Sequence, residues 1–112
     1  MAASTNRRLP QAALLLLLAL CLAAGPGRAA PGRHVIVMDK MKFGAVPARV
    51  RPGDVIIWVN RDIVRHTATA RNGSFNVDLR AGARSRMVVR RRGATEFFCR
   101  YHPGMKGRMV IA

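Results

Sequence analysis

The residues with the most distinctive chemistry lie near the C-terminus, where positions 99–105 read CRYHPGM. This stretch places a thiol, an imidazole and a thioether close together, and a second imidazole, His66, lies upstream. Sulfur ligands favour Cu(I), whereas imidazole binds both oxidation states. Two His, one Cys and a weak axial Met are the ligands of electron-transfer copper sites. The pattern therefore predicts a copper site whose ligands are His66, Cys99, His102 and Met105.

Other interpretations account for less of this set. Taken singly, Cys99 is typical of a small buried side chain, His102 of a surface loop and Met105 of a core. A structural zinc site would use further Cys or His rather than Met. Covalent haem attachment needs Cys-x-x-Cys-His, which does not occur here. A cysteine nucleophile paired with either His stays open as an alternative, although it gives Met105 no role.

The N-terminus has the pattern of a secretory signal. Arg7 and Arg8 precede an apolar run over residues 12–24, and small residues follow this run. The run is shorter than the roughly 20 residues of a membrane-spanning helix. We expect residues 1–29 to be a cleaved signal peptide, which implies export, most simply to a periplasm. An uncleaved anchor is the alternative.

Removal of this signal changes the composition that the fold must use. The full chain has 112 residues, 20 Lys and Arg against 5 Asp and Glu, and 2 Cys. Residues 30–112 keep 17 of the basic residues, all 5 acids and a net charge of +12. Cys21 leaves with the signal, so Cys99 has no internal disulfide partner, which agrees with a role as a metal ligand. This length suits one domain.

Short β-branched and aromatic runs between turn residues predict the elements that position the ligands. Strands are expected over 34–38, 54–60, 86–90, 95–99 and 108–111, with weaker candidates over 48–50, 64–70 and 75–79. No window shows an apolar repeat at helical spacing. About eight strands at this spacing indicate an antiparallel β-sandwich or barrel. The residues 99–105 would then form a loop between two strands.

At this level of detail the sequence resembles the cupredoxins, the small blue-copper proteins, and in particular their amicyanin and pseudoazurin branch. The matching stretches are 38–43 (MDKMKF), 50–54 (VRPGD), 58–62 (WVNRD), 66–67 (HT) and 99–107 (CRYHPGMKG). Two residues separate Cys from His and two separate His from Met, as in the short loop of amicyanin-like proteins. The resemblance implies a Greek-key β-sandwich, equatorial ligands His66, Cys99 and His102, and an axial Met105.

Three departures from that family pattern bear on the site. Thr67 stands where an Asn commonly follows the first ligand His. We expect its N–H to donate to the Cys99 sulfur and its hydroxyl to hold the loop, with Asn60 as a second supporting residue. Arg65 and Arg100 replace Pro and a small polar residue. Positive charge there favours Cu(I) and raises the reduction potential.

The large positive charge fits three roles, which are steering toward an acidic redox partner, contact with an anionic membrane surface without spanning it, or simple solvation. Nucleic acid is disfavoured because the chain is expected to be exported and lacks an aromatic-plus-basic recognition motif. A docking face around His102 would comprise Pro103, Gly104, Arg65, Arg100 and Lys106.

The sequence as a whole predicts a monomeric electron-transfer protein, rather than an enzyme, that binds one copper ion and exchanges electrons with redox proteins. A periplasmic copper carrier or buffer with the same ligands is the alternative.

Overall fold

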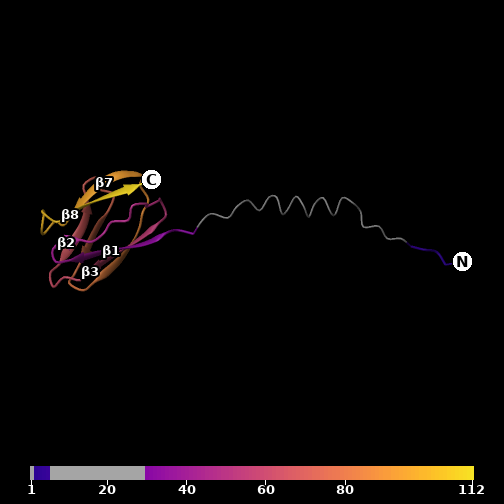
Figure 1. Ribbon diagram of the computed structural model, residues 1–112, viewed down its shortest axis with the longest axis horizontal. Coiled ribbons are helices and arrows are strands. Elements are labelled where there is room, and N and C mark those ends of the chain that lie inside the picture. Colours follow the sequence, from indigo (N-terminus) through magenta and orange to yellow (C-terminus); the bar gives the residue numbers. More distant parts are fainter. Residues whose placement is uncertain (1, 6–29) are drawn as a thin grey trace. The chain divides into compact units, whose positions relative to one another are not determined.

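The computed structural model describes residues 2–5 and 30–112 of the chain (Figure 1). The apolar run and the cleavage site of the predicted signal peptide therefore lie outside the described residues. Residues 31–112 form one folded unit. Across the described ranges, no helix has the length and apolar character needed to cross a membrane.

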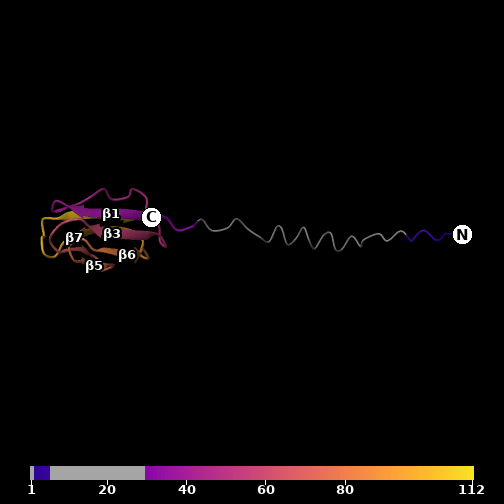
Figure 2. The same ribbon diagram turned by 90° about the horizontal axis from the view of Figure 1, so that it is seen from below.

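The described residues form two four-stranded sheets that pack face to face (Figures 1 and 2). The strands of the first sheet are, in spatial order, β2 (Lys42–Phe43), β1 (Arg33–Asp39), β3 (Val55–Asn60) and β6 (Arg84–Val88). Those of the second sheet are β5 (Asn76–Leu79), β4 (His66–Ala70), β7 (Gly93–Phe98) and β8 (Lys106–Ile111). The prediction of an all-β sandwich with about eight strands is confirmed.

The order of the strands follows from repeated crossings between the sheets. The chain changes sheet after β3, after β5 and after β6, so β3 pairs with β6 and β4 pairs with β7. Such pairing of non-consecutive strands is the Greek-key pattern of β-sandwiches. One expected feature differs, because β1 and β3 pair in parallel. The connection between them includes β2 and a long segment, which is enough for a parallel return.

Two local differences from the sequence prediction have a backbone cause. The weak candidate at 48–50 forms only an isolated bridge between Val50 and Ile111, in a segment bounded by Pro47 and Pro52. Strand β2 was not predicted. It follows a two-residue turn in which Lys40 and Met41 have φ values of 51° and 61°. Such turns usually carry Gly or Asn, so the sequence gives no turn signal here.

The core is centred on Phe97 of β7, which is fully buried. Its ring centroid lies 4.8 Å from that of Phe43 and 5.4 Å from that of Trp58, both at edge-to-face angles. The same apolar cluster continues to Cys99 and Met105. Two predicted ligands are therefore held by the core itself, at the end of the sandwich where β7 stops and β8 begins.

At the start of β1, Asp54 connects the strand to the turn before β3. Its carboxylate accepts N–H bonds from Gly32 at 2.8 Å and from Arg51 at 2.9 Å, and it lies 3.0 Å from His34 Nε2. The hydrogen bond with His34, followed by the two N–H bonds, lowers the pKa of Asp54 from 3.8 to about 2. The ionised form of Asp54 is thus favoured by the folded state.

Stability should consequently depend on pH through this group. Because the pKa of Asp54 is lower in the folded than in the unfolded chain, its contribution is present above about pH 4 and is lost as the pH falls toward 2. We expect the free energy of unfolding to decline over this window more steeply in the native protein than in Asp54→Asn. Urea unfolding at a series of pH values measures both slopes. Parallel profiles for the two proteins would contradict this role of Asp54.

Candidate metal centre

The predicted ligands come from the ends of three strands. His66 is the first residue of β4, Cys99 directly follows β7, and Met105 directly precedes β8. His102 lies between the last two, in the loop that joins β7 to β8. Since β7 pairs with both β4 and β8 in antiparallel fashion, the start of β4, the end of β7 and the start of β8 meet at one end of the second sheet.

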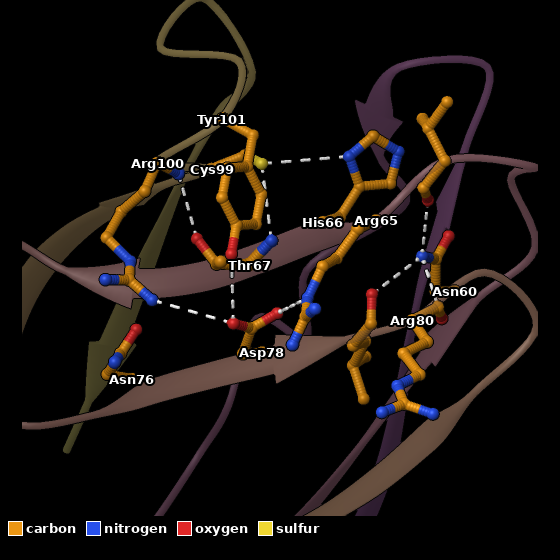
Figure 3. A network of polar contacts seen from close by, with 12 residues as sticks. Asn60, Arg65, His66, Thr67, Asn76, Asp78, Arg80, Cys99, Arg100 and Tyr101 are labelled. Carbon is orange, nitrogen blue, oxygen red and sulfur yellow. Dashed lines mark hydrogen bonds and ion pairs between the residues drawn. The ribbon is translucent and has the colours of Figure 1, made fainter.

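The Cys99 thiol is fully buried and has two polar neighbours (Figure 3). Its sulfur accepts the N–H of Thr67 at 3.3 Å and lies 3.7 Å from His66 Nδ1. The Thr67 hydroxyl accepts the N–H of Arg100 at 2.9 Å. Both hydrogen bonds expected of Thr67 are present. They join the segment that follows His66 to the segment that follows Cys99.

The loop between β7 and β8 is closed by its own backbone. The N–H of Cys99 donates to the carbonyl of Met105 at 3.0 Å, and the N–H of Met105 donates to the carbonyl of His102 at 2.8 Å. Met105 is only 4% exposed. The His102 ring is half-buried and lies edge-on to His66, with the ring centroids 5.1 Å apart. The structure thus brings the second imidazole beside the first.

Asp62, which the sequence did not single out, holds the other side of His66. Its Oδ2 lies 2.6 Å from His66 Nε2. The carboxylate also accepts the N–H groups of Lys40 and Met41, at 2.8 and 2.9 Å. The hydrogen bond from Met41 and then that from His66 lower the pKa of Asp62. An ionised carboxylate only accepts hydrogen bonds, so His66 Nε2–H donates to Asp62 and the ring turns Nδ1 toward Cys99.

Asn60 supports the segment between β3 and β4 and has no hydrogen bond to the Cys99 thiol. Its amide donates to the carbonyl of Val64 at 2.8 Å and, at 3.2 Å each, to those of Leu79 and Arg80. Its side-chain oxygen accepts the N–H of Asp62 at 2.9 Å. Asn60 therefore fixes the segment that carries Asp62 and leads into His66.

One pair of the predicted ligands has a spacing that fits a metal ion. Within residues 2–5 and 30–112, no three His, Cys, Asp or Glu side chains are grouped closely enough to hold an ion. The convergent pair is His66 and Cys99. Two donors at about 2.0 Å (nitrogen) and 2.3 Å (sulfur) from one ion, in a trigonal arrangement, are about 3.7 Å apart. The observed separation of 3.7 Å matches this. A donor set with thiolate, thioether and imidazole suits copper better than zinc.

The predicted docking residues are exposed, but two of them are engaged. Arg65 Nε lies 2.7 Å from one oxygen of Asp78, and Arg100 Nη2 lies 3.8 Å from the other. Their charges are thus partly neutralised, which sequence reasoning did not foresee. Large apolar side chains are also exposed close in sequence to the ligands, namely Ile63 and Val64 before His66 and Tyr101 after Cys99. Pro103, Gly104 and Lys106 are exposed as well.

Comparison with curated proteins gives distant relatives of one kind. The chain is 23% identical to amicyanin of Paracoccus versutus over 83 residues, which are 69% of this chain and 63% of that protein. It is 26% identical to amicyanin-alpha of Methylorubrum extorquens over 86 residues, which are 71% of this chain and 72% of that protein. The match thus covers less than two thirds of the first of these relatives. No protein-family model matches the chain.

Solved structures give the same picture. A Cu(I) form of an amicyanin variant matches with a TM-score of 0.64 at 23% identity, over 76% of this chain and 87% of the other. A copper-containing nitrite reductase from Thermus scotoductus matches with a TM-score of 0.62 at 23% identity, over 79% of this chain but 24% of the enzyme. The described domain therefore has the cupredoxin fold. The amicyanin structure has the same fold.

Proposed function

We propose that this chain is a type 1 copper protein that carries single electrons between redox proteins. The observation that supports this most strongly is the buried pair formed by His66 Nδ1 and Cys99 Sγ, 3.7 Å apart. The ring of His66 is oriented by Asp62 at its far nitrogen, as is usual for metal-binding histidines. His102 and Met105 supply the remaining donors from one loop. The amicyanin-like fold agrees with this function.

Copper bound by these four side chains would supply reversible one-electron chemistry. The chain contributes a fixed environment for it. The N–H of Thr67 stabilises negative charge on the Cys99 sulfur, and the complete burial of Cys99 excludes water. The loop that carries His102 and Met105 is closed by backbone hydrogen bonds. Donors that are held in this way rearrange little when the charge of the site changes, and this favours fast electron transfer.

The proposal extends to partners and location. His102 is the ligand nearest the surface, so the docking face would surround it, with Pro103 and Gly104 as apolar contacts and Arg65, Arg100 and Lys106 at its edge. An acidic redox protein is the complementary partner. The signal-like residues 1–29 support export to the periplasm, where the domain would act as a monomer and not as an enzyme.

The charge of this face should control reaction rates. We expect electron transfer from the reduced protein to the anion ferricyanide to slow as salt is added, because opposite charges attract less strongly when screened. Transfer to a cationic cobalt(III) phenanthroline complex should become faster. Stopped-flow kinetics at several ionic strengths measure both rates, and Lys106→Glu should flatten both profiles. Salt profiles that are flat for both reagents would contradict a role for charge in docking.

The contact between Asp62 and His66 should strengthen copper binding. We expect Asp62→Asn to lower the copper affinity about 10- to 100-fold, the usual cost of losing the partner of a metal-binding histidine. Competition with a chelator of known affinity measures this. Asp39→Asn is the matched control, because Asp39 is an exposed carboxylate at the end of β1. An equal affinity for both variants would contradict the role of Asp62.

Electrochemistry separates an electron carrier from a copper carrier. The proposed function predicts a reversible one-electron wave for the copper-loaded protein, with the metal retained in both oxidation states. A copper carrier or buffer would instead pass Cu(I) readily to a recipient chelator and lose the metal on oxidation. That result would overturn the proposal in favour of copper transport.

A further inference from the structure

Asp78 on β5 links the two segments that carry the ligand residues (Figure 3). Arg65, next to His66, donates from Nε to Asp78 Oδ1 at 2.7 Å. Tyr101, in the loop after Cys99, donates its hydroxyl to Oδ2 at 3.1 Å, and Arg100 Nη2 lies 3.8 Å from the same oxygen. One carboxylate therefore accepts two hydrogen bonds, one from the segment before β4 and one from the loop after β7, and it forms an ion pair with a second residue of that loop.

We propose that Asp78 is a positioning residue that holds the loop 99–105 against the segment bearing His66, and that it also limits the positive charge beside the buried thiol. The inference rests on the proposed function in one respect, namely that this loop binds copper. The mechanical part concerns the protein alone.

The contacts of Asp78 form the outer of two layers that join the same segments. In the inner layer, Thr67 donates its N–H to the Cys99 sulfur and accepts the N–H of Arg100. Thr67 is the partner of Asp78 in the pairing of β4 with β5. The carboxylate thus extends from the same register position, and reaches the side chains of the loop whose backbone Thr67 holds. Without the outer layer, Thr67 would supply the remaining hydrogen bonds between the segment that follows His66 and the loop.

An isolated surface ion pair would not have this effect, because exposed pairs contribute little to stability. Asp78 differs because its partners come from two separate segments. The hydrogen bond from Arg65, together with that from Tyr101, lowers the pKa of Asp78. The carboxylate is therefore ionised at neutral pH, accepts hydrogen bonds from Arg65 and Tyr101, and attracts Arg100 as an ion pair. Its loss should loosen the loop while changing the stability of the whole domain only slightly.

The charge argument gives a second, independent consequence. Arg65 and Arg100 are adjacent in sequence to the two ligands His66 and Cys99, and in both ion pairs the acidic partner is Asp78. Removal of its charge leaves both guanidinium groups uncompensated beside the site. Positive charge there disfavours Cu(II) relative to Cu(I), so the reduction potential should rise.

The test compares Asp78→Asn with Glu96→Gln, which removes a carboxylate that pairs with Arg71 on another part of the second sheet. In the metal-free protein, amide hydrogen exchange of Arg100 and His102 should be about tenfold faster in Asp78→Asn, while that of Trp58 in β3 stays unchanged. In the copper-loaded Asp78→Asn variant, a chelator should remove Cu(I) faster than from the native protein. The reduction potential of the copper should also be higher. Asp78→Glu should restore the slow exchange, and Glu96→Gln should behave like the native protein.

Exchange at Arg100 and His102 within twofold of the native rate would overturn the proposal. Equal acceleration at Trp58 would also overturn it, because the substitution would then have destabilised the whole domain. If the native protein binds no copper, the proposed function fails, but the exchange measurements on the metal-free protein still decide whether Asp78 holds the loop.

Discussion

Cys99→Ser should abolish the intense visible absorption of the copper-loaded protein completely. That absorption requires charge transfer from a thiolate to copper, and within the described residues Cys99 is the free cysteine. Serine is nearly isosteric, and its hydroxyl oxygen can still accept the N–H of Thr67, so the variant should fold. Visible spectra after addition of Cu(II) measure the effect.

A matched substitution separates the thiolate from the rest of the site. Met105→Leu keeps the volume of a core side chain and removes only the axial donor, so we expect it to retain the band and shift the potential. A band that persists in Cys99→Ser would contradict the assignment of Cys99 as the thiolate ligand. Loss of the band in both variants through unfolding would be visible in their circular dichroism.

Gly107→Ala should be the most destabilising single-methyl change in the ligand-bearing sheet. Gly107 of β8 lies opposite Phe97 of β7, and a Cβ at this position would overlap the Phe97 ring. That ring is fully buried against Phe43 and Trp58 and has no space to withdraw. Overpacking of this kind costs about 1–3 kcal/mol. For a domain of this size, each kcal/mol lowers Tm by roughly 4–8 °C.

Gly104→Ala is the control for this prediction. A Cβ at Gly104, in the loop that precedes β8, meets nothing within 4 Å. Thermal unfolding should therefore give a clearly lower Tm for Gly107→Ala and a nearly native Tm for Gly104→Ala. Equal values for the two variants would show that the Phe97 ring is not packed over β8 as described.

Much of the fold could be predicted because it depends on local patterns. The alternation in residues 54–60 places Ile56 and Trp58 on one face, and both are fully buried in β3. Turn residues such as Pro52 and Gly53, just before β3, mark strand boundaries. These boundaries can be predicted without knowing which strand pairs with which. The loop 99–105 was recognisable because three residues with ligand chemistry, Cys99, His102 and Met105, occur within seven positions.

The features that were missed depend on contacts between distant residues. Asp62 binds the N–H groups of Lys40 and Met41, which lie 22 and 21 positions away. These bonds stabilise a turn with positive φ values at Lys40 and Met41. Neither residue type predicts such a turn. The parallel pairing of β1 with β3 and the engagement of Arg65 by Asp78 likewise appear only once the strands are placed. Local sequence contains no signal for such long-range hydrogen bonds.

The most direct test of the central claim is to add one equivalent of Cu(II) to the purified protein and to record its visible and electron paramagnetic resonance spectra. A site built from His66, Cys99, His102 and Met105 predicts an intense thiolate-to-copper band together with a narrow copper hyperfine splitting, as in type 1 copper sites. A weak, ordinary Cu(II) spectrum, with tight binding of Cu(I) alone, would contradict an electron-carrying copper centre.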